Sequence, residues 1–102
     1  MKQFKGDKLK ALLLIYFTNY TRESNSKTLA IFEKEMGFYA GNPSTRELLG
    51  YLIKQHALVQ GKVTRSRVFY FVDKKAVAKV IEGQDILTLH DKYLKDVAVL
   101  WK

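Results

Sequence analysis

Residues 42–73 restrict the possible folds of this chain more than any other stretch of the sequence. The stretch opens on Asn42-Pro43-Ser44, which holds the only proline of the chain. Apolar residues then recur at the three- and four-residue spacing of one helical face, and they are Leu48, Leu49, Leu52 and Ile53. The pattern predicts a helix over residues 43–56. It is followed directly by residues that favour strands.

A β-hairpin is predicted over residues 58–72. Residues 58–63 form its first strand, and residues 67–72 form a second strand that is very rich in strong β-formers, with the sequence Arg-Val-Phe-Tyr-Phe-Val. Both faces of this second strand are largely apolar, so alternation leaves open which face is buried. The turn, Thr64-Arg65-Ser66, lies within a cluster of cations formed by Lys62, Arg65 and Arg67.

Further helices are predicted on both sides of this unit. Their expected ranges are residues 7–21, 27–36, 74–82 and 85–102. The first helix carries apolar residues along one face, namely Leu9, Leu12, Leu13, Tyr16, Phe17 and Tyr20. We therefore expect residues 1–102 to form a single α+β domain that is mainly helical and has a two-stranded hairpin.

Polar and glycine residues mark where these helices begin and end. Ser26 is expected to cap the helix over residues 27–36, and Gly37 to end it. Phe38, Tyr39 and Ala40 would then form a connector, whose two aromatic rings pack back against the core. Asp73 is expected to cap the helix over residues 74–82.

The helix over residues 43–56 has two possible caps. Asn42 can cap it with Pro43 at the first helical position, where the missing N–H group costs nothing. Alternatively, Ser44 caps the helix and Glu47 reaches back in a capping box. The two readings place the start of the helix within two residues of each other.

The charge balance indicates a polyanionic partner. The chain has 18 Lys and Arg against 10 Asp and Glu, a formal net charge of +8. Such a balance favours nucleic acid as the binding partner, with an acidic membrane surface as the second choice. The alternative is a globular domain that is basic without using its charge for binding.

Several function classes find no support in the sequence. The chain has no cysteine, which excludes disulfides and thiolate chemistry, and no apolar run long enough to span a bilayer. The two histidines, His56 and His90, are far apart, and the glycines do not form a phosphate-binding loop. We therefore expect no enzymatic activity, no cofactor and no metal, and a location in the cytoplasm of the cell or of a host.

A helix followed by a basic hairpin can contact duplex DNA in two ways. The helix presents side chains to base edges in the major groove, and the hairpin reaches phosphates. Arg46 is the main candidate for a guanine edge, with a phosphate contact as the alternative. The hydroxyls of Ser44 and Thr45 either bind phosphate or cap the helix. The full set of expected DNA contacts is Ser44, Thr45, Arg46, Tyr51, Lys54, Lys62, Arg65 and Arg67.

The last predicted helix carries an apolar stripe that continues almost to the end of the chain. The stripe contains Ile86, Leu89, Tyr93, Val97, Leu100 and Trp101. A terminal helix with such a face requires a surface to pack against. We expect that surface to be the same helix of a second subunit, because dimers are the commonest oligomers. The alternative is the first helix of the same subunit.

The order of elements from Thr45 to Asp73 resembles the winged helix-turn-helix family, as in MarR-like and PadR-like regulators. Residues 52–59, Leu-Ile-Lys-Gln-His-Ala-Leu-Val, match the step from recognition helix to wing, with His56-Ala57 where the family often has glycine. The resemblance implies a winged-helix fold with a C-terminal dimerisation helix. It also implies a dimeric double-stranded DNA-binding protein that regulates transcription. Similar small winged helices occur in archaeal viruses and plasmid partition systems, so a partition adaptor is the alternative.

Two other functions remain open at this point. A winged helix can serve as a protein-interaction module, with the apolar last helix as its docking face. Aromatic residues beside cations can also bind RNA or single-stranded DNA by base stacking, and Tyr39, Tyr51 and Tyr70 are candidates for that role.

Overall fold

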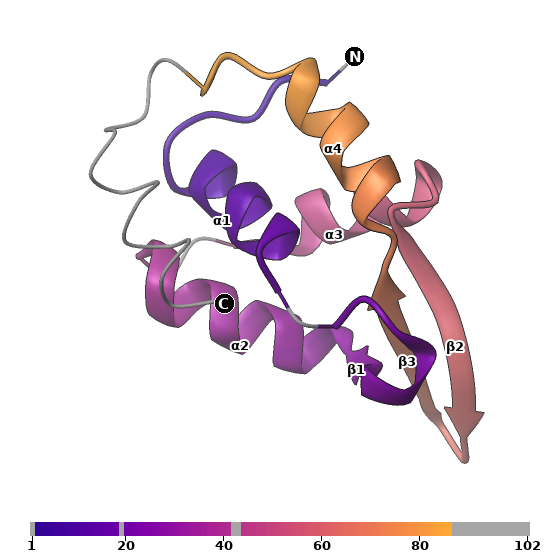
Figure 1. Cartoon of the computed structure of the whole chain (residues 1–102). Helices are drawn as coiled ribbons and strands as arrows, with labels where there is room; N and C mark the ends of the chain where they lie inside the picture. The colour runs from indigo at the N-terminus through magenta and orange to yellow at the C-terminus, as the bar shows by residue number, and fades with distance from the viewer. Residues whose placement is uncertain (1, 19, 42–43, 87–102) are drawn as a thin grey trace.

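A computed structural model describes residues 2–18, 20–41 and 44–86 of the chain (Figure 1). In the described part the fold is α+β and mainly helical, with four α-helices and a three-stranded antiparallel sheet. The elements in chain order are α1 (Asp7–Tyr16), the 3-10 turn η1 (Glu23–Asn25), β1 (Lys27–Thr28), α2 (Leu29–Ala40), α3 (Arg46–Lys54), β2 (Leu58–Thr64), β3 (Arg67–Val72) and α4 (Lys74–Glu82).

The helix α1 lies at the centre of the helical part, with α2, α3 and α4 around it (Figure 1). Its residues 11–15, Ala-Leu-Leu-Leu-Ile, are all buried, which is why apolar residues cover more than one side of this helix. Each fully buried leucine contributes about 1.5–3 kcal/mol. The other large, fully buried side chains come from the surrounding elements and include Phe32, Met36, Leu48, Leu52, Leu58, Val72 and Val77.

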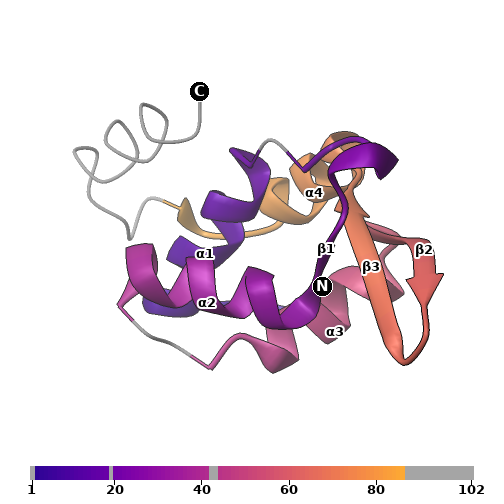
Figure 2. The ribbon, with the colours of Figure 1, turned by 90° about the horizontal axis from the view of Figure 1, so that it is seen from below.

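The β2–β3 hairpin has its base in this core and projects its tip away from the helices (Figure 2). Leu58 pairs with Val72 at the base, where their side chains are 2% and 1% exposed. Strand alternation then places Val68 and Tyr70 on the same inner face as Val72, and Tyr70 packs against the core. The structure thus assigns the inner face of β3, which the sequence pattern left open.

The sheet has a third strand that the sequence analysis missed. The two residues of β1 pair antiparallel with β3, Lys27 opposite Tyr70 and Thr28 opposite Phe69. Lys27 was expected in the second helix and is instead in a strand. A two-residue strand has no recognisable periodicity, and the partner that forms it is distant in the sequence. The expected two-stranded hairpin is confirmed, and β1 adds a third strand to its sheet.

The first helix is shorter than expected. It ends at Tyr16 rather than near residue 21. The backbone carbonyl of Tyr20 accepts a hydrogen bond from the Val72 amide of β3, which draws this part of the chain towards the sheet. Phe17 and Tyr20 still pack against the core, although they lie beyond the helix.

The second helix is shifted towards the C-terminus relative to the expected range. Thr28, not Ser26, caps α2, its hydroxyl accepting a hydrogen bond from the Ile31 amide at 3.4 Å. Gly37 lies buried inside the helix, and Gly41, with φ 92°, ends it in the left-handed conformation. The expected connector is therefore the last turn of α2, and Phe38 is 79% exposed instead of packing back against the core.

The last two described helices differ in how well they match their expected ranges. The helix α4 occupies the expected residues 74–82, and Asp73 caps it by accepting hydrogen bonds from the amides of Lys75 and Ala76. The helix α3 begins later than expected, at Arg46. Its N-cap position is Thr45, whose side chain makes no capping hydrogen bond. The expected cap at Asn42 and Pro43 lies outside the described residues, and Glu47 pairs with lysines instead of closing a capping box.

Residues beyond Ile86 lie outside the described part, and with them most of the helix expected over residues 85–102. Among the residues that the structure describes, no helix combines the length and the apolar character needed to cross a membrane.

A partly buried hydrogen bond between Tyr20 and Glu35 of α2 predicts how stability depends on pH. The Tyr20 hydroxyl donates to Glu35 Oε1 at 2.7 Å. Burial, this hydrogen bond and the negative charge of Glu35 raise the pKa of Tyr20 to about 12 from 10.0. The folded state therefore holds the proton more tightly than the unfolded state, and stability should fall as pH rises from 10 towards 12. Chemical denaturation across this range should show the loss in the natural protein, and the Tyr20→Phe variant should lack that component.

Candidate nucleic-acid interface

The hairpin tip combines cations with an irregular backbone. Thr64 pairs with Arg67, which leaves Arg65 and Ser66 as a two-residue turn. Arg65 has φ 51°, and non-glycine residues adopt such values only at a cost of about 1–2 kcal/mol. Glycine is the usual residue at such a turn position. An arginine here costs local stability, and local rules of this kind are most often broken at functional positions.

A β-bulge directs a second cation near the tip. Between the pairs Gln60–Tyr70 and Val63–Val68, the two residues Gly61 and Lys62 lie opposite Phe69 alone. The Lys62 ammonium consequently lies 5.1 Å from the centre of the Phe69 ring. Bulges re-aim side chains and add twist to a hairpin. Lys62, Arg65 and Arg67 are all exposed, as expected from the sequence.

The outer face of α3 is polar and accessible. Leu48, Leu49 and Leu52 are buried towards the core, while Arg46, Gly50 and Lys54 are exposed. The Arg46 side chain is 88% exposed, and its Nε lies 3.7 Å from Glu33 Oε1 of α2. Exposed pairs of this kind contribute about 0–1 kcal/mol. Arg46 can therefore exchange this carboxylate for another acceptor at little cost.

Two of the expected DNA contacts, Thr45 and Tyr51, are less exposed than the rest of the set. Thr45 is 1% exposed, and its hydroxyl has no hydrogen-bond partner among the described residues. We remove Thr45 from the candidate contacts, because so buried a side chain does not reach a phosphate. Ser44 beside it is exposed. Tyr51 is half-buried, with its ring edge-on to Phe4 at 5.6 Å between ring centres.

The N-terminal segment lies beside α3, which the sequence analysis did not foresee. Phe4 is 4% exposed, and its amide donates to Gln84 Oε1 at 2.8 Å. The same Gln84 side chain donates from Nε2 to the Lys2 carbonyl at 2.8 Å. The Gln3 side chain donates from Nε2 to the Gly83 carbonyl at 2.6 Å. These bonds join segments about 80 residues apart in sequence, so sequence spacing gave no sign of them.

The segment also changes the charge on α3. Glu47 lies on the outer face of the helix, where Lys2 and Lys8 both form ion pairs with it, the Lys8 pair at 3.1 Å. Hydrogen bonds from Lys2 and then Lys8 hold the pKa of the Glu47 carboxyl below its usual range. Lys5 lines the same hollow as Lys8 and Glu47. Asp7 lines the hollow as well, and it pairs with Lys10, so lysines outnumber the two carboxylates.

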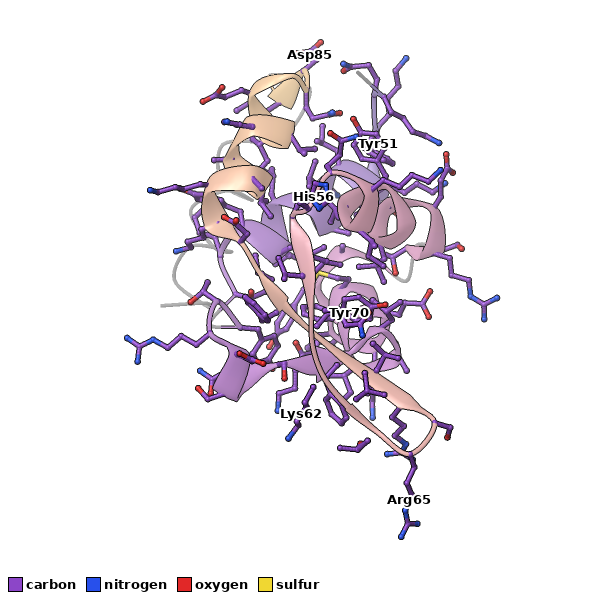
Figure 3. The ribbon with its side chains drawn as sticks, turned by 90° about the vertical axis from the view of Figure 1, so that its right-hand side faces the viewer. Tyr51, His56, Lys62, Arg65, Tyr70 and Asp85 are labelled. Carbon is purple, nitrogen blue, oxygen red and sulfur yellow. The ribbon has the colours of Figure 1, made fainter. Side chains whose placement is uncertain are left out.

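His56 joins α3 to the hairpin (Figure 3). It has φ 58° and follows the C-terminal cap of the helix. Glycine adopts this left-handed backbone conformation without strain, whereas a side chain makes it costly. The His56 side chain is exposed.

The His56→Gly variant should consequently be more stable than the natural protein. Relief of the left-handed strain outweighs the extra freedom of glycine in the unfolded chain, for a net gain of roughly 0.5–1 kcal/mol. The midpoint of urea denaturation checks this. Gln55→Gly is the matched control, because Gln55 has φ −86°, and that variant should lose stability.

The residues expected to form a dimer surface are described only in part. Leu89, Tyr93, Val97, Leu100 and Trp101 lie outside the described residues. Ile86 is half-buried against its own subunit, in an apolar groove of about 350 Å³ between α1 and α4. Ile86 packs against the core of its own chain.

No protein-family model matches this chain, and no curated protein or solved structure matches it significantly.

Proposed function

We propose that this protein is a winged-helix protein that binds double-stranded DNA and regulates transcription. In this proposal α3 enters the major groove, and the β2–β3 hairpin acts as a wing on the phosphate backbone. The observation that carries it is the placement of exposed cations on two consecutive elements, Arg46 and Lys54 on α3 and Arg65 at the projecting hairpin tip.

The dimensions of DNA support this assignment of roles. The major groove is wide enough for an α-helix, and arginine is the side chain that most often reads guanine there. Arg46 begins α3, and residues near the start of a recognition helix contact base edges. Lys62, Arg65 and Arg67 end in cationic groups at the hairpin tip, which suits them to phosphate. The strained backbone at Arg65 supports a role for its side chain in binding.

We also propose that two copies bind together. One α3 helix offers few base-reading side chains, and two-fold symmetric DNA sites match protein dimers. The proposed contacts are those of the C-terminal stripe beyond Ile86. Light scattering of the purified protein should give twice the mass of the chain, and a purely monomeric mass would contradict this part of the proposal.

Binding to labelled duplexes over a salt series tests the proposed function. One duplex should come from the region upstream of the protein's own gene, and a second should be a scrambled version of it. Affinity for both should fall steeply between about 50 and 200 mM salt, because neutralised phosphates release counterions. The upstream duplex should bind more tightly. Undetectable binding at low salt, or affinity that is unchanged at high salt, would rule out the proposal.

A protein-interaction module is a second candidate, favoured by one observation on α2. Phe38 is 79% exposed and lies beside the partly exposed Ile31 and Tyr39 around a hollow that Lys34 also lines. Exposed apolar patches often mark interaction sites. We take a second copy of this chain as the partner to test. If this surface holds the dimer together, Phe38→Ser should convert it to a monomer, whereas an unchanged dimer mass would exclude this role.

A further inference from the structure

We infer that the N-terminal segment, residues 2–8, is a third DNA-contacting element, and that Lys2, Lys5 and Lys8 bind phosphates beside the site of α3. The inference rests on the proposed function and extends it to a part of the chain outside the winged-helix resemblance. It follows from how the segment is held, from the charge it brings, and from where it lies.

The segment is held by specific contacts at its backbone. Gln84 bridges the Phe4 amide and the Lys2 carbonyl with two hydrogen bonds of 2.8 Å. The Phe4 ring fills a buried position against Tyr51 of α3. These contacts fix the backbone and leave the lysine side chains at the surface. A cation on a fixed backbone loses less conformational freedom on binding than one on a mobile tail.

The charge of the segment corrects an unfavourable feature of α3. Glu47 on the outer face would repel phosphate if it stood alone. Lys2 and Lys8 both pair with it, so two positive charges surround one negative charge. Lys5 adds a further cation to the same hollow. Asp7 offsets little of this, because it pairs with Lys10 at 3.5 Å.

The position of the segment makes the surface continuous. Figure 3 shows Tyr51, the residue of α3 that contacts the segment, far from Arg65 at the hairpin tip. In Figure 1 the N-terminal segment and the hairpin tip lie on opposite sides of α3. On a duplex, a helix in the major groove has a phosphate backbone on each side. The hairpin would contact one of them and the segment the other.

Neutralising the three lysines tests the inference. In the variant with Lys2→Gln, Lys5→Gln and Lys8→Gln, the slope of log affinity against log salt should fall by about 2 to 3, since each lost phosphate contact removes about 0.9. The matched control carries Arg22→Gln, Lys34→Gln and Lys74→Gln. It removes the same charge from other places: the residue before η1, the helix α2 and the start of α4. The control should keep nearly the natural slope. Denaturation curves should confirm that both variants are folded.

The outcomes separate this inference from the proposed function. If the natural protein binds duplex DNA and both triple variants lower the slope equally, the lysines act only through net charge, and the inference is wrong while the function stands. If the natural protein does not bind duplex DNA, both fail. Vesicles with about one-third anionic lipid serve as a further probe. A segment variant that loses vesicle binding but keeps the natural DNA slope would assign the lysines to a membrane surface and overturn the inference.

Discussion

Alanine at both Arg65 and Arg67 is expected to weaken binding to every duplex and to lower the salt slope by about 2, because each arginine is proposed to neutralise one phosphate. Both side chains are exposed at the hairpin tip, Arg65 in the two-residue turn and Arg67 at the start of β3. Because both are exposed, their loss should leave folding intact. The ratio of affinities for the upstream and scrambled duplexes should stay nearly constant.

Arg46→Ala should behave differently from the hairpin variant. If Arg46 reads a guanine edge, its loss should cost about 1–3 kcal/mol on the preferred duplex and much less on the scrambled one. Equal losses on both duplexes would show that Arg46 contacts phosphate only. Glu33 provides a further check. Glu33→Gln removes the carboxylate near Arg46 and should strengthen binding slightly without changing the sequence preference.

Arg65→Gly separates charge from backbone strain at the turn. Glycine relieves the cost of the positive φ at this residue, so this variant should form a more stable hairpin while losing the cation. Weaker DNA binding by a more stable protein would show that the arginine is there for binding. Unchanged binding would contradict a phosphate contact from Arg65.

Phe32→Ala is expected to have the largest effect on stability, a loss of about 3–5 kcal/mol in the free energy of unfolding. The Phe32 ring is fully buried at 0% exposure and meets Tyr20 edge-on, with 5.7 Å between ring centres. Its removal leaves a cavity between α2 and the rest of the core, which the close-packed surroundings cannot fully close. Such a loss is a large share of the stability of a domain of this size.

Phe38→Ala is the matched control, since it removes the same side chain from the same helix. Phe38 is 79% exposed, so this variant should change the free energy of unfolding by less than about 0.5 kcal/mol. Urea denaturation of the two variants measures the difference directly. Similar losses for both would mean that Phe38 is covered in solution, and a concentration-dependent loss would identify a second copy as the cover.

The sequence was most informative where a pattern is local and long. The fourth helix is confirmed residue for residue, because Asp73, an apolar stripe and Gly83 all lie within its own segment. The hairpin is confirmed for a similar reason, since the run Val-Phe-Tyr-Phe-Val is strongly biased towards strands. The cations at its tip needed no tertiary information to be found.

Errors arose where a distant part of the chain determined the conformation. Gly37 is a sound helix terminator by its sequence, but the packing of α2 against α1 carries the helix on to Gly41. Lys27 and Thr28 became a strand because β3 lies beside them. Thr45 was predicted to contact phosphate, but the packing around the start of α3 buries its side chain.

The sequence by itself determined the mainly helical α+β class, the order of helix and hairpin that the structure shows within residues 46–72, and the positive charge. Each of these depends on composition or on periodicity within one element, which are properties of a chain segment alone. Tertiary structure alone decided which face of β3 is buried, which residues of α3 reach the surface, and that Lys2 and Lys8 meet Glu47. Such contacts join residues that are distant in sequence, and only the packing of the core brings them together.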